Sequence, residues 1–290
     1  MEIAGLSGAR GVSASASVEA WSGKDRGHEN FPVGSLLIRP DLRRHVHAFY
    51  GFARNADDIA DSGQLPPEEK IARLDAMEEV LLGRLADAAA PSAARLRLSL
   101  AETGVAPRHA LDLLHAFRQD ATKRRYANFE ELYAYCRYSA MPVGRHVLDL
   151  HGEDEATHAA SDALCTNLQI LNHLQDGAAD LAALDRCYLP ADLMAAHGAS
   201  IDDLRGARAS PELRAVHFAL LARVAELDGL ARALPGRVRA RRLRLETAVI
   251  LGLAQRLAAR LRRFDPVAMR VKLGRGDVAA AVLGALRFLP

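Results

Sequence analysis

Apolar residues recur at the spacing of an α-helix along almost the whole chain after about residue 40, and this pattern constrains the fold most. Residues three and four positions apart share one face of a helix, so each such run can bury one face. No series of alternating apolar and polar residues indicates a strand. The sequence therefore predicts an all-α protein, with helices over the ranges 40–60, 67–88, 92–102, 107–120, 129–150, 156–181, 211–234, 239–263 and 278–288.

The domain organisation follows from composition along the chain. Glycine and serine dominate up to Gly27, which predicts a disordered tail over residues 1–27. No long polar linker follows, so we expect residues 28–290 to form a single domain. No signal-peptide pattern, no run of about 18 apolar residues and no CxxC pair is present. These features indicate a cytoplasmic protein.

The charge of the chain limits the kinds of molecule that it is expected to bind. The formal net charge is only +2 at pH 7, so we expect no nucleic-acid partner. Arginine accounts for 34 of the 38 basic residues, and its planar guanidinium suits bidentate carboxylate or phosphate partners. The base composition of the genome is the alternative explanation for most of these arginines.

The segment YGFARNADDIADSG carries three aspartates within five positions. At about 100° per residue, Asp57, Asp58 and Asp61 lie on one stripe of the expected helix. Arg54 precedes them by one turn on the same stripe. Like charges repel at this spacing, so the cluster predicts a site that a cation completes.

A second polar stripe lies in the segment LQILNHLQDGAADL. Counted from Gln169, its four members stand at offsets 0, 3, 7 and 11 and therefore share one helix face. The remaining positions are mostly leucine, isoleucine and alanine, so the stripe is expected to face the protein interior. Burial of such a stripe is costly unless it is paired or binds a metal ion. The stripe consists of Gln169, Asn172, Asp176 and Asp180.

Oxygen ligands without histidine or thiolate suit a hard cation. Mg²⁺ typically binds one or two carboxylates together with waters and substrate phosphates. Two aspartate helices that face each other could therefore hold a diphosphate through Mg²⁺. The alternative is two solvated acidic faces with salt-bridge partners.

These motifs resemble those of the squalene and phytoene synthases, the head-to-head isoprenoid synthases. DDIAD and the Gln-x-x-Asn-x-x-x-Asp-x-x-x-Asp pattern look like the two aspartate motifs of that family. The resemblance also covers ENFPVGSLLIRPDLRRHVHAFYGFAR, FRQDATKRRYANFEELYAYCRYSAMPVG and RCYLP. It implies an isoprenoid synthase helical bundle in which the two aspartate faces oppose each other across a central cavity.

Within the family, ENFPVGS and SAMPVG are most similar to the hydroxysqualene synthases of hopanoid pathways. Gln175 agrees, because phytoene synthases commonly have arginine at that position. The resemblance implies Mg²⁺-dependent ionisation of presqualene diphosphate, rearrangement of the cation and capture by water to give hydroxysqualene. No NADPH is expected. The alternatives are condensation of two farnesyl or geranylgeranyl diphosphates to presqualene diphosphate, squalene or phytoene, and a non-catalytic helical scaffold.

The resemblance also implies roles for individual residues. Two or three Mg²⁺ ions would hold the diphosphate, and Tyr135 would face the cation unless it is a core aromatic with a satisfied hydroxyl. The expected metal ligands are Asp57, Asp61, Asn172, Asp176 and Asp180, and the four aspartates are also catalytic candidates. The candidate substrate contacts are Arg54, Asp58, Gln169, Asn172, Arg124 and Arg186, of which Arg124 and Arg186 are the weaker ones.

Three local features of the sequence lead to further predictions. Ser139, Met141 and Pro142 predict a disturbance of the helix near Gly144. Asp185 stands where the family usually has glycine, which predicts a remodelled turn after the second motif. The ending DVAAAVLGALRFLP forms a short apolar helix that either docks peripherally on a membrane or packs on the bundle. The expected partners are a prenyl diphosphate lipid and other enzymes of its pathway.

Overall fold

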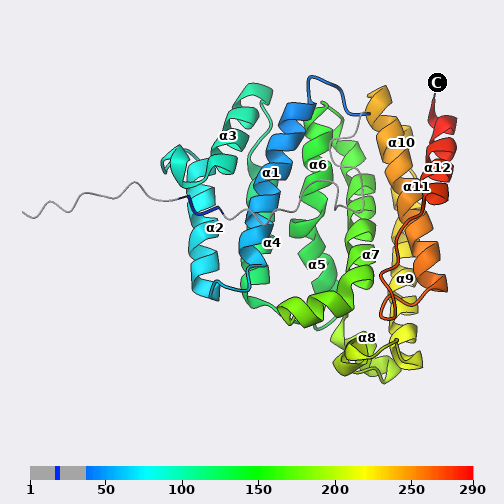
Figure 1. Cartoon of the computed structure of the whole chain (residues 1–290). Helices are drawn as coiled ribbons and strands as arrows, with labels where there is room; N and C mark the ends of the chain where they lie inside the picture. The colour runs from blue at the N-terminus through cyan, green and yellow to red at the C-terminus, as the bar shows by residue number, and fades with distance from the viewer. Residues whose placement is uncertain (1–16, 20–36, 290) are drawn as a thin grey trace, which may run out of the picture.

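The computed structural model describes residues 17–19 and 37–289 of the chain (Figure 1). Within these ranges the chain is helical and forms no β-strand, which confirms the all-α prediction. The α-helices are α1 (Arg43–Ala60), α2 (Pro67–Leu81), α3 (Pro91–Thr103), α4 (Arg108–Thr122), α5 (Phe129–Ser139), α6 (Met141–Leu150), α7 (His158–Leu184), α8 (Ala191–His197), α9 (Pro211–Ala231), α10 (Leu234–Arg237), α11 (Arg241–Arg263) and α12 (Arg275–Ala285). The short 3₁₀ helices are η2 (Asp87–Ala89), η3 (Glu155–Thr157), η4 (Ile201–Arg205) and η5 (Leu286–Phe288).

The helices form a bundle with α7 at its centre (Figure 1). α7 packs against α6, α9 and α11, while α1 packs against α2, α3 and α4. Three apolar clusters result among the described residues. One lies around α1 to α4 and contains Phe52 and Met77, one lies around α7, α9 and α11 and contains Leu171, and a small one lies between α11 and α12. α12 lies on the outer side of α11, at the edge of the bundle.

The predicted helix over residues 129–150 is divided into α5 and α6. The break falls at Ala140, whose φ of −122° and ψ of −49° leave the helical region. Pro142 follows in the first turn of α6, where proline needs no hydrogen-bond partner for its nitrogen. The predicted disturbance is therefore a complete helix break.

Gly144 allows α6 to approach α7 closely. A Cβ atom at this position would lie 2.3 Å from Ser161 Oγ and 2.6 Å from Cys165 Sγ. Both distances are well inside van der Waals contact, so only glycine fits here. The contact sets the spacing between the two helices along the cavity described below.

The other differences concern element ends and short helices. α2 ends at Leu81, earlier than predicted, and α8 and α10 were not predicted because they are too short to show a period. None of the described helices is long and apolar enough to cross a membrane. The ENFPVGS segment lies outside the described residues, and the domain boundary at residue 28 stays a prediction.

Candidate functional site

The first aspartate motif lies on the last turns of α1. Phe52, Ala56 and Ile59 are fully buried, which turns the opposite polar stripe away from the apolar cluster. Arg54 Nη2 lies 2.6 Å from Asp58 Oδ1, and its Nη1 lies 3.0 Å from Asp57 Oδ2. The predicted stripe is therefore formed, and one arginine of the same helix pairs with two of its carboxylates.

The second motif lies in the middle of α7. Arg270 pairs with Asp176, its Nε atom 2.9 Å from Asp176 Oδ1. Gln175 Nε2 donates to the Val271 carbonyl at 2.6 Å. The segment after α11 therefore anchors this part of α7. Asp180 is half-buried one turn further on.

The two motifs influence each other electrostatically. Burial, followed by the neighbouring Asp61 carboxylate, raises the pKa of Asp57 to about 8. Burial, followed by the carboxylates of Asp176 and Asp61, raises the pKa of Asp180 to about 7. Asp61, directly after α1, and Asp180 on α7 are thus close enough to repel. Such an excess of negative charge is typical of a site that binds cations.

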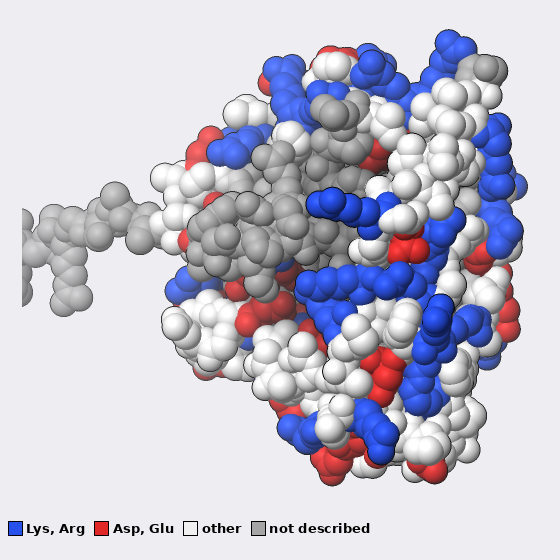
Figure 2. Space-filling model, turned by 45° about the vertical axis from the view of Figure 1, so that its right-hand side comes forward, with Lys and Arg blue, Asp and Glu red and all other residues white. Residues whose placement is uncertain are grey.

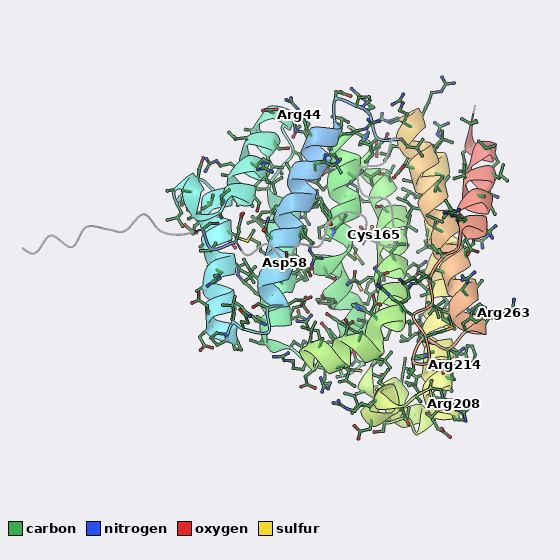
Figure 3. The ribbon with its side chains drawn as sticks, viewed as in Figure 1. Arg44, Asp58, Cys165, Arg208, Arg214 and Arg263 are labelled. Atoms are coloured by element: carbon green, nitrogen blue, oxygen red, sulfur yellow. The ribbon has the colours of Figure 1, made fainter. Side chains whose placement is uncertain are left out.

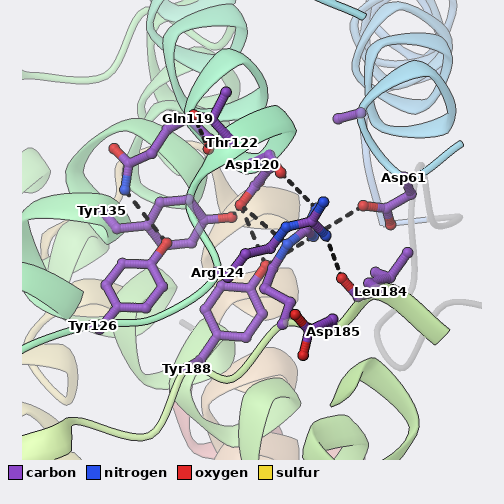
Figure 4. Close-up of polar contacts among 12 residues, drawn as sticks. Asp61, Gln119, Asp120, Thr122, Arg124, Tyr126, Tyr135, Leu184, Asp185 and Tyr188 are labelled. Atoms are coloured by element: carbon purple, nitrogen blue, oxygen red, sulfur yellow. Dashed lines mark hydrogen bonds and ion pairs between the residues drawn. The ribbon is translucent and has the colours of Figure 1, made fainter. Parts of the chain in front are cut away.

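Arg186 connects the first motif to α4, and Figure 4 labels its partners Asp61 and Asp120. Its Nη1 lies 2.9 Å from Asp61 Oδ1, and its Nη2 donates to the Asp120 carbonyl at 2.9 Å. The residue is only 3% exposed. Burial opposes its charge, but Tyr188, Asp120 and Asp61 raise its pKa further, so it stays a cation. The structure thus places this weaker candidate beside the first motif.

Asp120 lies at the centre of an aromatic cluster that the sequence analysis missed. The Tyr135 hydroxyl donates to Asp120 Oδ2 at 2.7 Å, and the Tyr188 ring stacks on His173 with a centroid distance of 3.6 Å. Burial raises the pKa of Asp120 to about 6, against the lowering effect of Arg186. Asp120 falls on the buried face of α4, seven positions after Leu113, and an aspartate on an apolar stripe was the signal available.

Lys70 is a second missed residue near the first motif. Its Nζ donates to the Ala60 carbonyl, the last residue of α1, at 2.8 Å. Burial, followed by the nearby Arg124 and Arg186 guanidinium groups, lowers the pKa of Lys70. Lys70 begins the apolar stripe of α2, so a lysine on a buried face was again the signal.

Arg124, which follows α4 in the chain, contacts the C-terminal end of α7. Its guanidinium donates to the Leu184 carbonyl, and Arg125 pairs with Asp185. Asp185 has a φ of 51°, the left-handed conformation that glycine adopts most readily. The aspartate therefore makes the turn where the family usually has glycine, and the chain returns so that Arg186 meets Asp61.

An apolar cavity of about 360 Å³ lies inside the bundle, and it reaches the second motif at Gln169 and Asn172. Its walls come from α1, α6, α7, α10 and α11, among them Cys165 on α7; Figure 3 labels Cys165 and also Asp58 on α1. Gln169 and Asn172 line it, as the predicted stripe requires. Tyr135 is not among the described lining residues, and its satisfied hydroxyl agrees with the core alternative.

The carboxylates are the candidate metal ligands of this site. No group of three or more His, Cys, Asp or Glu side chains lies within metal-binding distance among residues 17–19 and 37–289. Guanidinium groups instead pair with Asp57, Asp61 and Asp176. The raised pKa values of Asp57 and Asp180 nevertheless mark carboxylates that a cation would stabilise, and the all-oxygen donor set fits Mg²⁺.

Known proteins are similar to this chain over most of its length. The family model for squalene/phytoene synthase matches residues 24–277. A hydroxysqualene synthase of Rhodopseudomonas palustris is 48% identical over 268 residues, which cover 92% of this chain and 91% of the relative. A hydroxysqualene synthase of Zymomonas mobilis is 41% identical, over 90% of both chains.

Solved structures agree with the sequence relatives. A squalene synthase from Alicyclobacillus acidocaldarius is 33% identical, with a TM-score of 0.71, over 82% of this chain and 90% of that one. A dehydrosqualene synthase is 19% identical with a TM-score of 0.76, over 89% and 91% of the two chains, a likeness that shows the fold alone. The family-model match and the high identity over nearly full length lead to one assignment: this chain belongs to the squalene/phytoene synthase family.

Proposed function

We propose that this protein converts presqualene diphosphate and water to hydroxysqualene and diphosphate. One observation carries the proposal: carboxylates of the two motifs, paired with arginines, lie close enough to repel one another, and Gln169 and Asn172 of the second motif line an apolar cavity. A diphosphate needs the charged end, and two prenyl chains need the apolar one. The identities of 41–48% to hydroxysqualene synthases support this choice within the family.

The leaving group determines what the charged end must do. When the carbon–oxygen bond breaks, its electron pair goes to the diphosphate, and negative charge grows on oxygen. Arg54 and Arg186 carry permanent positive charge at the site and would stabilise that charge. Lys70 and Arg124 lie close enough to Arg186 to add to the same potential.

We include Mg²⁺ in this proposal, as two or three ions bound with the diphosphate. Asp57, Asp61, Asp176, Asp180 and the Asn172 amide would hold them. When bound, Mg²⁺ supplies Lewis-acid stabilisation of the departing oxygens. Arg270, the half-exposed arginine now paired with Asp176, would then be free to turn toward the phosphate oxygens.

The cavity governs the fate of the carbocation. Its walls are largely apolar, so water enters only where polar side chains allow it. Gln169 and Asn172 supply amide groups at the end near the second motif. We assign them to orienting the substrate and the capturing water. The water oxygen bonds to the rearranged cation and its proton leaves with the diphosphate, which completes the balance without a reductant.

A second candidate is the condensation of two farnesyl or geranylgeranyl diphosphates. The specific observation that favours it is the likeness to other branches of the family: a phytoene synthase of Thermus thermophilus is 32% identical over 204 residues, 70% of this chain and 67% of that relative. The same carboxylate pair would serve either reaction, because both release diphosphate.

The proposal also covers where the enzyme works. We place it in the cytoplasm, in peripheral contact with the membrane, because a C₃₀ product is insoluble in water. Enzymes that supply presqualene diphosphate and consume hydroxysqualene are the expected pathway partners.

A product assay tests the proposal. Purified protein with Mg²⁺ is incubated with presqualene diphosphate and, separately, with farnesyl diphosphate, with and without NADPH. We expect hydroxysqualene from presqualene diphosphate alone, without NADPH. Consumption of farnesyl diphosphate would favour the condensing reaction. Absence of turnover and of Mg²⁺-dependent diphosphate binding would favour the non-catalytic scaffold.

A further inference from the structure

The outer face of α12 is apolar although it faces solvent. Val278, Val282, Leu283, Leu286 and Leu289 are each between 44% and 67% exposed. Val278, Val282 and Leu286 are four residues apart, so they form one stripe along α12 and η5. Single exposed apolar side chains are ordinary, but a continuous stripe marks an interaction surface.

The inner face of the same helix explains the orientation of the stripe. Ala281 and Ala285 are buried against α11, and a Cβ atom at Gly252 would lie 3.1 Å from that of Ala281. Small residues on both helices therefore bring α12 close to α11. The large apolar residues Val282, Leu283 and Leu286 are exposed instead and belong to none of the apolar clusters of the described residues.

Basic residues surround this apolar stripe. Residues 256–290 contain eight basic and two acidic residues, a net charge of +6 compared with +2 for the whole chain. Arg263, Lys272, Arg275 and Arg287 are exposed, and the acidic Asp277 is already paired with Arg260 at 3.0 Å. Figure 2 shows basic side chains along the edges of an uncharged strip on this side of the molecule.

The position of α12 relates the stripe to the cavity. Leu243, Thr247 and Ile250 of α11 line the cavity, whereas Ala248 and Leu253 on another face of α11 pack on the α12 side. One helix thickness therefore separates the stripe from the space proposed for the prenyl chains. A surface that holds lipid against α12 would hold it close to the site of reaction.

We propose that the apolar stripe of α12, with its basic margin, docks on the surface of an anionic lipid bilayer. α12 has 11 residues, about half the length that a membrane-spanning helix requires, so it would lie in the interface. The apolar side chains enter the acyl boundary and the arginines contact lipid phosphates. This inference names the surface for the peripheral contact contained in the proposed function, and it rests on that contact.

Vesicle co-sedimentation of the full chain tests the inference. The vesicles are phosphatidylcholine alone and phosphatidylcholine mixed with phosphatidylglycerol, each at low salt and at about 0.5 M salt. We expect binding to the anionic vesicles, and about tenfold less binding to the neutral ones or at high salt. The triple variant Val282→Ser, Leu283→Ser, Leu286→Ser is expected to lose binding about tenfold or more.

The matched control removes exposed apolar side chains elsewhere. Leu98→Ser with Leu230→Ser replaces two isolated residues of similar exposure on α3 and α9, and should bind vesicles like the wild type. All variants should keep the wild-type rate on detergent-dispersed substrate, which separates docking from the proposed reaction. Wild-type protein that stays in the supernatant, or a triple variant that binds normally, would overturn the inference. So would a wild-type dimer that the triple substitution dissociates without any vesicle binding.

Discussion

The two aspartate motifs look equivalent in sequence but are held in different ways. On α1, the cation that pairs with Asp57 and Asp58 is Arg54, from the same helix and one turn earlier. On α7, Asp176 pairs with Arg270, which lies 94 residues further along the chain. Asp57 and Asp58 of the first motif are therefore paired locally, whereas Asp61, which pairs with Arg186, and Asp176 of the second motif depend on the packing of distant segments.

This difference bears on how the site can respond to substrate. The Arg54 side chain is 14% exposed, whereas that of Arg270 is 47% exposed. A buried pair on one helix has little freedom to rearrange. An exposed arginine from a separate segment can move without disturbing the core. We therefore expect the second motif to be the more mobile half when a diphosphate arrives.

The largest expected effect tests what the motifs share. Asp57→Asn and Asp176→Asn should each lower kcat by about 10³-fold or more, because either change removes a carboxylate from the proposed cation site. Far-UV circular dichroism should stay unchanged, since neither carboxylate supports the apolar core. Steady-state rates with presqualene diphosphate measure the effect. Full activity in either variant would remove that motif from the site.

The next effect concerns the cation between the two motifs. Arg186→Gln should lower the free energy of unfolding by about 3–5 kcal/mol, because the buried Asp120 loses its compensating charge. Urea unfolding measures this change. Arg125→Gln is the matched control, because its exposed pair with Asp185 should contribute little to stability. Equal effects of the two changes would contradict a buried role for Arg186.

A pH series compares one histidine beside each motif helix. His146 stacks on Phe49 of α1, and His217 is buried on α9, the partner of α7. Burial lowers the pKa of His146 to about 3 and that of His217 to about 4. As the pH falls, these histidines are therefore protonated in the unfolded chain at a higher pH than in the folded one. The folded state loses stability as the pH falls below about 6.5.

At pH 5 the expected loss is about 2 kcal/mol for each of these histidines. His146→Leu and His217→Leu should each reduce the loss of stability between pH 7.5 and pH 5 by the contribution of the histidine that was replaced. Urea unfolding at pH 7.5 and at pH 5 measures it. A variant whose stability still falls as steeply as that of the wild type would show that its histidine is protonated without cost in the folded state.

The smallest effect on stability is expected at the exposed arginine of the second motif. Arg270→Gln should change the free energy of unfolding by less than about 1 kcal/mol, because its ion pair is half-exposed. It should still lower kcat/KM by about tenfold, because Asp176 loses its orienting partner. Arg263→Gln, an exposed arginine away from both motifs, is the control. A large loss of stability would mean that the second motif is as rigid as the first.

Several parts of the site could be predicted from local patterns. The aspartate stripes follow from helical periodicity, and Asp120 and Lys70 were open to the same reasoning because each interrupts an apolar stripe. The break at Ala140 was predicted as a disturbance, since proline cannot continue a helix without loss. The closeness of Arg186 to Asp61 was not predictable in this way, because 125 residues separate them.

The sequence alone determined that the chain is helical and which face of each main helix is polar, because the period of 3.6 residues is a local property. Only the tertiary structure decided that Arg186 meets Asp61, that Arg270 meets Asp176 and that Tyr135 turns its hydroxyl to Asp120. These contacts depend on how α1, α4, α5 and α7 pack, through interactions between residues far apart in the chain. Sequence periodicity does not determine such distances, because they arise only when the apolar faces of the helices pack against one another.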